Sequence, residues 1–270
     1  MSCLLIIDVQ NDFMQGGSLQ VSDSMDILKP INTLRKQHNN LFDLIVLSQD
    51  WHPFNHMSFA SNHANKKVFD TINLNGSNQI LWPNHCVQES FGSEIHKGLH
   101  REKSDIIIKK GTNPTIDSYS AFMDNDKKHK TELESILKKN NITTVYICGL
   151  ATDYCVYYSC LDAASLGFKT YFLQDASKGV SKDTTAKAIE NMIKYNIKHL
   201  KLTLIFCFWL EPILINREYS TTSTPFLYPI ENKPFQKWID LFNKETKHVE
   251  DKLDKAIDDL NSVTDREIRP

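Results

Sequence analysis

Five short runs of strand-forming residues constrain the fold of this 270-residue chain most strongly. The first of these runs is rich in isoleucine and does not alternate apolar with polar residues, which is typical of a strand buried on both faces of a parallel sheet. Segments with helical spacing separate most of them, as parallel connections require. The runs occupy residues 4–9, 43–49, 105–109, 143–147 and 169–174, and helices are expected at 22–37, 94–99, 131–139, 153–166 and 181–195. We therefore predict an α/β fold, a three-layer α/β/α arrangement with a mostly parallel central sheet.

A change of composition near residue 200 divides the chain into two parts. Residues 1–200 contain the whole strand and helix pattern and are expected to form one domain. Residues 201–270 are expected to be an atypical C-terminal extension. The apolar stretch at 200–215 is too short and too interrupted by charge and proline to predict a membrane span, and its first part could supply a sixth strand. Residues 235–263 show the spacing of an amphipathic helix.

Charge and cysteine usage argue against several classes of partner and fold. The net charge of −2 gives no reason to expect nucleic acid or an anionic membrane as partner. The six cysteines are scattered without CxxC pairs, which argues against a zinc ribbon or a disulfide scaffold. The first residues lack the basic segment and long apolar core of a signal peptide. We therefore expect a cytoplasmic protein in a reducing compartment.

Reactive side chains stand at the ends of four predicted strands. Asp8 ends the first strand, and Asp50 and His52 follow the second. Lys110 ends the third, and Cys155 follows the fourth. Because parallel sheets bind ligands at the carboxyl ends of their strands, all of these side chains are expected at one edge. Together they include the residue types that covalent amide chemistry needs.

Cys155 is expected near the first turn of a helix, just after a strand that ends at Gly149. Free N–H groups and the helix dipole favour a thiolate there, although a buried structural cysteine is the alternative. Asp8 is the candidate base, with a capping role as its alternative. Lys110 would stabilise both negative forms unless it is a solvated surface lysine. The turn amides near Ala151 and Cys155 could form an oxyanion hole.

A second candidate group consists of Asp50, His52 and His85. The Asp-x-His spacing on an extended segment places both side chains on one side, whereas His85 comes from a long loop-like stretch at 53–90. One carboxylate and two imidazoles, with positions left for water or ligand, suit Zn²⁺, Fe²⁺ or Mn²⁺. Five other histidines lack comparable context and are expected at the surface or in loops: His56, His63, His96, His100 and His129.

The candidate residues lie in five motifs, which follow one another along roughly the first 200 residues. They are Ile-Ile-Asp-Val-Gln-Asn-Asp-Phe (6–13), Ser-Gln-Asp-Trp-His-Pro (48–53), Trp-Pro-Asn-His-Cys-Val-Gln (82–88), Lys-Gly (110–111) with Asp-Ser-Tyr-Ser-Ala-Phe (117–122), and Cys-Gly-Leu-Ala-Thr-Asp-Tyr-Cys-Val (148–156). In this order they resemble the nicotinamidases of the isochorismatase-like cysteine hydrolase superfamily. The resemblance implies hydrolysis of nicotinamide to nicotinate and ammonia, a step of NAD salvage.

The resemblance also implies roles for the residues of the first group. Asp8 would be the general base, Lys110 the third member of the triad and Cys155 the nucleophile that forms a thioester. The amides of Ala151 and Cys155 would hold the oxyanion, and the Leu150–Ala151 peptide would be cis. Water at or near a bound metal would then hydrolyse the thioester.

For the second group the resemblance implies a divalent metal, zinc foremost with iron or manganese as alternatives. Asp50, His52 and His85 would hold it, and it would bind the pyridine nitrogen directly or through its water shell. Aromatic positions that flank the substrate ring match three residues: Phe13, Trp82 and Tyr119.

Two alternatives stand beside this reading. One is a cysteine amidohydrolase for another small amide or carbamoyl compound, although the metal ligands and aromatic residues favour a flat heteroaromatic amide. The other is an inactive binding protein or assembly subunit, against which the intact triad argues. The chain also departs from the family after about residue 197, so the extension could be genuine, an altered gene end or a homo-oligomer contact.

Overall fold

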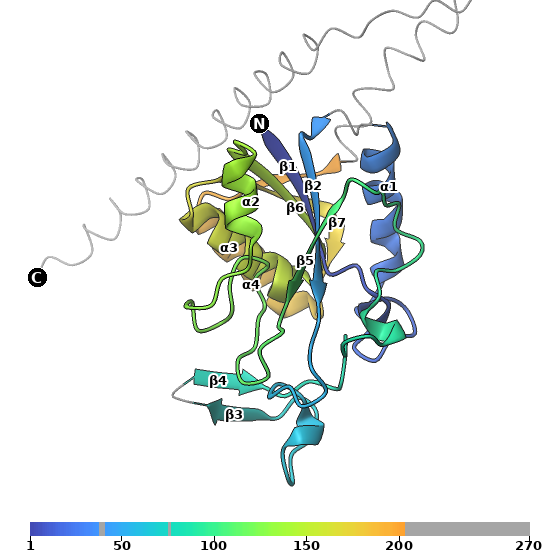
Figure 1. The fold of residues 1–270 in the computed structure, drawn as a ribbon, viewed down its shortest axis with the longest axis vertical. Helices are drawn as coiled ribbons and strands as arrows, with labels where there is room; N and C mark the ends of the chain where they lie inside the picture. The colour runs from blue at the N-terminus through green and yellow to red at the C-terminus, as the bar shows by residue number, and fades with distance from the viewer. Residues whose placement is uncertain (38–40, 75–76, 203–270) are drawn as a thin grey trace, which may run out of the picture. The chain divides into compact units, whose positions relative to one another are not determined.

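A six-stranded parallel sheet forms the centre of the fold (Figure 1). The computed structural model describes residues 1–37, 41–74 and 77–202. Neighbouring strands all pair in parallel, in the order β5-β2-β1-β6-β7-β8. The strands are β1 (Ser2–Ile7), β2 (Leu44–Asp50), β5 (Ile106–Lys110), β6 (Thr144–Leu150), β7 (Lys169–Lys178) and β8 (Lys198–Leu200). The prediction of a mostly parallel sheet is confirmed, and β8 supplies a sixth strand slightly earlier than expected.

The central strand β1 is buried on both faces, as its unbroken apolar sequence predicts. Residues 4–7 of β1 are each at most 1% exposed. This strand lies between β2 and β6, where Ile6 pairs with Leu47 on one side and Cys148 on the other. Solvent is thus excluded from the middle of the sheet, and polar residues at the strand ends collect at its carboxyl edge.

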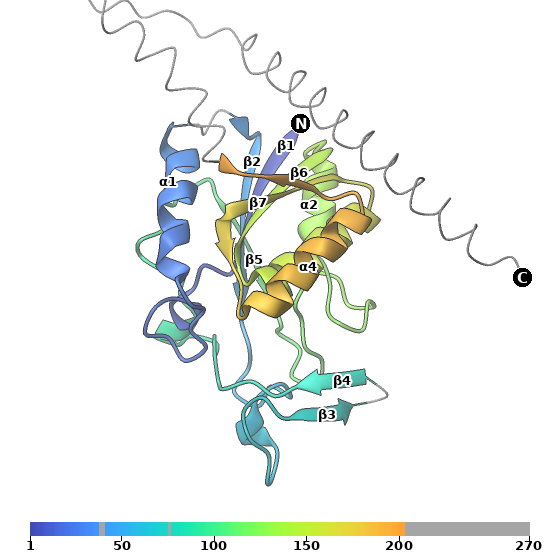
Figure 2. The ribbon, with the colours of Figure 1, turned by 180° about the vertical axis from the view of Figure 1, so that it is seen from behind.

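Helices cover both faces of the sheet and complete the three predicted layers. One face carries α1 (Leu28–Gln37), and the other carries α2 (Leu133–Lys139), α3 (Tyr157–Ser165) and α4 (Lys182–Lys194) (Figure 1 and Figure 2). The core on the second side joins Leu5 and Phe172 of the sheet to Leu137 and Met192 of the helices. A 3₁₀ turn at Ser24–Ile27 precedes α1, so the helix predicted over 22–37 is split.

Two local predictions were wrong. Residues 94–99 form no helix, because their backbone pairs with the loop after β1: Asn11 N–H donates to Glu94 O at 3.0 Å and His96 N–H donates to Val9 O at 2.8 Å. A 3₁₀ turn at Phe91–Ser93 stands just before them. The loop-like stretch at 53–90 contains an antiparallel hairpin, which lies beyond the carboxyl edge of the sheet (Figure 1). Its strands are β3 (Thr71–Leu74) and β4 (Ser77–Ile80).

The predicted extension lies almost wholly outside the described residues. Its helix over 235–263 and the domain boundary at 200 therefore stay predictions. Among the helices that the structure describes, none has the length and apolar character needed to cross a bilayer.

Candidate active site

Four reactive side chains meet at the carboxyl edge of the sheet, as the strand ends predict. Asp8 follows β1 directly, with a positive φ of 47° that turns the chain away from the strand. Asp50 and Lys110 are the last residues of β2 and β5 and are partners in the strand register. Cys155 lies in the turn after β6. The parallel sheet therefore brings together residues that are as far as 147 positions apart (155 − 8).

Lys110 is the centre of this group. Its side chain is fully buried, and its Nζ lies 3.0 Å from Asp8 Oδ2 and 2.5 Å from Asp50 Oδ1. The same ammonium donates to Ser118 O at 2.9 Å and lies 3.4 Å from Cys155 Sγ. Burial alone would lower the pKa of Lys110, but the Asp50 and Asp8 carboxylates raise it well above its usual value. Lys110 is thus a buried cation held by two anions, and the solvated surface alternative is wrong.

Asp8 has the electrostatic environment of a proton acceptor near neutral pH. Burial raises the pKa of Asp8 to about 6, although the Lys110 ammonium opposes that rise. Ser48 Oγ donates to Asp8 Oδ1 at 2.6 Å and fixes the carboxylate plane. The carboxylates of Asp8 and Asp50 and Sγ of Cys155 lie within 4.8 Å of one another. A carboxyl group of this kind can both accept and return a proton at neutral pH.

The environment of Cys155 favours a resting thiol, and the expected thiolate is a wrong prediction. Burial raises the pKa of Cys155 well above its usual value, with Lys110 opposing and the Asp8 carboxylate reinforcing the rise. Residues Thr152–Val156 form a single π turn before α3, with Cys155 only 7% exposed. Desolvation is the largest cause of this rise in pKa, so the thiol needs a base to become a nucleophile.

The turn that holds Cys155 begins with the Leu150–Ala151 peptide, which is cis as the resemblance implies. Gly149 before it has a φ of 116°, and a Cβ there would lie 2.1 Å from Ile7 O. Only glycine therefore lets β6 pass β1 this closely. Ala151 reaches the pocket beside Cys155, which is the position that an oxyanion hole needs.

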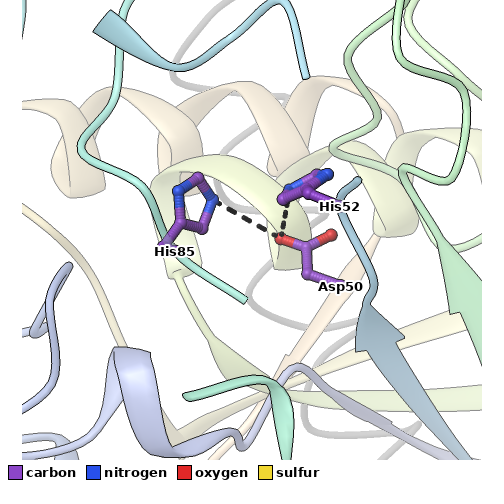
Figure 3. A group of neighbouring side chains, drawn as sticks. All are labelled: Asp50, His52 and His85. Carbon is purple, nitrogen blue, oxygen red and sulfur yellow. Dashed lines mark ion pairs between the residues drawn. The ribbon is translucent and has the colours of Figure 1, made fainter. Parts of the chain in front are cut away.

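Asp50 also faces two imidazoles, His52 and His85 (Figure 3). Asp50 Oδ2 lies 3.5 Å from His52 Nε2 and 4.0 Å from His85 Nε2. Nδ1 of His52 bonds Gly111 O and Nδ1 of His85 bonds Pro83 O, each at 2.8 Å. Both Nδ1 atoms are therefore the donors, which leaves each Nε2 free as a ligand atom. This buried set of one carboxylate and two imidazoles, within 4.8 Å, fits a divalent metal ion.

Gly111 makes room for one of these imidazoles. Its φ is +63°, and a Cβ there would lie 2.3 Å from His52 Cε1. The Lys-Gly pair at the end of β5 therefore serves both groups, since the lysine joins the two carboxylates and the glycine accommodates His52.

His56 is a residue that the sequence reasoning missed. It lies in a loop as expected, but it is fully buried. The centroid of its ring is 4.2 Å from the ring centroid of His52. Its Nδ1 contacts Ser58 Oγ at 2.7 Å. Ligand atoms of His52, His56 and Asp117 also lie within 4.8 Å of one another. The spacing of His56 from the Asp-x-His motif was the available signal.

An aromatic pocket opens onto both groups. Phe13, Trp82 and Tyr119 line it as predicted, and so does Tyr154, which the sequence reasoning missed. The ring centroid of Tyr154 lies 5.1 Å from that of Trp82 and 5.5 Å from that of Tyr119. The space, including its open mouth, is about 430 Å³. Its remaining lining is mainly the reactive residues and three apolar side chains: Leu19, Val21 and Val180.

A family model described as the isochorismatase domain matches residues 2–201. The chain belongs to the isochorismatase family. A nicotinamidase of Acinetobacter baylyi is 47% identical over 177 residues, which cover 66% of this chain and 81% of that protein. Among solved structures of isochorismatase-like proteins, yeast nicotinamidase bound to the inhibitor nicotinaldehyde superposes with a TM-score of 0.70 at 33% identity, covering 74% of this chain and 100% of that one. Pyrazinamidase of Pyrococcus horikoshii in complex with zinc gives a TM-score of 0.62 at 36% identity, covering 74% and 98%.

Proposed function

We propose that this isochorismatase-family protein is a nicotinamidase, which hydrolyses nicotinamide to nicotinate and ammonia in NAD salvage. The observation that carries the proposal is the contact of Lys110 with Asp8 and Cys155 in an aromatic pocket. A cysteine, an adjacent base and a group that balances their charge are the parts of an acyl-transfer site. Relatives that match most of this chain are nicotinamidases.

In the first half of the reaction, Asp8 takes the thiol proton while Cys155 Sγ attacks the carboxamide carbon. The N–H groups of Ala151 and Cys155 receive the oxyanion. Asp8 then gives the proton to the amide nitrogen, the C–N bond breaks and ammonia leaves. The pKa of Asp8 of about 6 supports both directions of this transfer.

In the second half, Asp8 takes a proton from a water molecule, which attacks the thioester carbon. The C–S bond breaks, Asp8 returns its proton to Cys155 Sγ, and the product leaves as the carboxylic acid, which gives up its remaining proton to solvent and becomes nicotinate. Lys110 stays protonated throughout and contacts both Asp8 Oδ2 and Cys155 Sγ. It therefore stabilises the negative charge whenever that charge is on Asp8 or on Cys155, and the amides of Ala151 and Cys155 receive the charge on the oxyanion.

The proposed metal ligands are Asp50, His52 and His85, with zinc as the proposed ion and iron or manganese as alternatives. Zinc is preferred because these ligands suit it and because the Pyrococcus pyrazinamidase is in complex with zinc. When bound, such an ion supplies a coordination position for the ring nitrogen or for water. Asp50 also contacts Lys110, so the same carboxylate links both parts of the site.

The substrate proposal predicts a particular order of activities on small amides. Metal-replete protein is expected to release ammonia from nicotinamide, and from benzamide at least about tenfold more slowly, because benzamide lacks the ring nitrogen. A coupled ammonia assay over nicotinamide, benzamide and small carbamoyl compounds measures this. Preference for a carbamoyl compound would replace the substrate with that class, and inactivity on the whole panel would support a binding protein.

If Asp50, His52 and His85 hold the metal, replacing one of these ligands should release the metal and leave the protein folded. His85→Ala is expected to weaken metal binding by about 100-fold or more, because the site keeps only two ligands. The metal content of the dialysed protein is measured by elemental analysis. His63→Ala is the matched control, since His63 Nε2 contacts Met57 O at 2.7 Å outside the ligand set. Equal metal content in the two variants would reject His85 as a ligand.

We also propose a reducing, cytoplasmic location with a small-molecule substrate as the partner. Every cysteine in the described part of the chain is a free thiol: Cys3, Cys86, Cys148, Cys155 and Cys160. Free thiols, one of them the proposed nucleophile, suit a compartment that keeps cysteines reduced.

A further inference from the structure

Asp153 belongs to the motif around the nucleophile, but the mechanism gives it no chemistry. Its side chain is only 8% exposed and points from the Cys155 turn to the loop between β7 and α4. We propose that Asp153 is a positioning residue, which ties this loop to the nucleophile turn and so holds Val180 in place as a wall of the substrate pocket. The proposal rests on the proposed function for its substrate.

The carboxylate of Asp153 accepts hydrogen bonds from three successive parts of the loop and helix. Val180 N–H donates to Oδ1 at 2.9 Å, and Ser181 N–H donates to Oδ2 at 3.2 Å. The hydroxyl of Thr184, in the first turn of α4, also donates to Oδ2. An ionised carboxylate accepts such bonds strongly, and its charge lies at the positive end of a 13-residue helix.

The loop packs tightly against α4 and the Asp153 carboxylate at Gly179. A Cβ at Gly179 would lie 1.9 Å from Thr185 Oγ1 and 3.1 Å from Asp153 Oδ1. The backbone therefore passes closely between α4 and the Asp153 carboxylate. Its position depends on the carboxylate as well as on the strand before it.

The hydrogen bonds that Asp153 accepts from Val180, Ser181 and Thr184 form an anchor for the loop. Val180 connects this anchor to the substrate pocket. It lines the pocket with Ala151 and Cys155, although 39% of its surface is exposed. A side chain so placed forms the rim of the pocket, where a bound nicotinamide ring would contact it in the ground state and in the transition state alike. Displacing Val180 weakens binding of the substrate and of the transition state equally. KM therefore rises, and kcat stays nearly unchanged.

Steady-state kinetics on the metal-replete full chain test the anchor. Asp153→Asn keeps the shape but turns an amide NH₂ toward backbone donors, so KM for nicotinamide is expected to rise about fivefold or more, with kcat within about twofold. Asp183→Asn is the matched control: it removes a charge from the same first turn of α4 at an exposed position, and KM should not change. An unchanged KM in Asp153→Asn, or a fall in kcat alone, would overturn the proposal.

A double-mutant cycle with Val180→Ala separates positioning from a general structural effect. If Asp153 acts through the Val180 wall, Asp153→Asn raises KM less in the Val180→Ala background than in the natural chain. Independent effects of the two substitutions would contradict the proposed route.

A readout without substrate separates this proposal from the proposed function. The rate at which N-phenylmaleimide modifies Cys155, followed by peptide mass spectrometry, is expected to rise at least about threefold in Asp153→Asn and to stay unchanged in Asp183→Asn. If the natural chain does not hydrolyse nicotinamide but the maleimide rates differ in this way, the function fails and the anchor stands. Equal rates in all three proteins would reject the anchor.

Discussion

Cys155→Ala is expected to abolish nicotinamide hydrolysis, lowering kcat by about 10⁴-fold or more. The proposed reaction needs a covalent bond between Cys155 Sγ and the carboxamide carbon, and alanine offers no atom that can form it. The other reactive groups of the site would remain, so binding should survive while the chemistry is lost. Ammonia release at saturating nicotinamide measures the rate, and calorimetric titration with nicotinamide measures the binding.

Cys160→Ala provides the matched control for this loss. Cys160 is a fully buried thiol in α3, one turn and a half further along the same segment, and it does not line the pocket. Its removal is expected to cost about 1 kcal/mol of stability and to change kcat less than twofold. Activity of Cys155→Ala close to that of Cys160→Ala would sink the nucleophile assignment.

The convergence of the site could be predicted because it depends on strand order in the chain and not on fine packing. Asp8, Asp50 and Lys110 each stand at the end of a predicted strand, and a parallel sheet has to place such ends at one edge. The strand end at Gly149 could also be predicted from the sequence. The cis peptide Leu150–Ala151 could be predicted only from the resemblance to the family. Topology thus accounts for most of the successful predictions.

The state of Cys155 could not be predicted because it depends on desolvation by segments distant in sequence. A helix terminus near a cysteine suggests a thiolate, yet burial and the Asp8 carboxylate reverse the direction of the pKa shift. The burial of His56 has a related cause, since Ile116, which is 60 residues further along the chain, contacts His56 Nε2 through its carbonyl oxygen. Such effects appear only once the surrounding chain is in place.

The hairpin was missed for a different reason. Asn75 and Gly76 form a strong turn signal between the two short strands, but the polar residues around them suggested only a loop. The helix expected over 94–99 failed because a short helix is marginal on its own, and pairing with residues 9–11 satisfies the backbone instead. Local patterns this short are decided by tertiary contacts.

Lys110→Met is expected to lower the free energy of unfolding by about 3–5 kcal/mol as well as to remove activity. Methionine fills a similar volume, but it leaves the buried Asp8 and Asp50 carboxylates without their common counter-ion. Urea unfolding of metal-replete protein measures the stability. Lys109→Met is the matched control, because Lys109 is the exposed neighbour whose Nζ lies 3.6 Å from the Trp51 ring centre, and its loss should cost about 1 kcal/mol or less.

The double variant Asp8→Asn with Lys110→Met separates charge balance from catalysis. Removing one carboxylate along with the ammonium relieves the uncompensated charge, so part of the lost stability should return. Activity should not return, because both the base and the charge partner of Cys155 are gone. If Lys110→Met is as stable as Lys109→Met, the ion pairs of Lys110 with Asp8 and Asp50 do not stabilise the fold. If the double variant recovers activity but not stability, Asp8 is not the base.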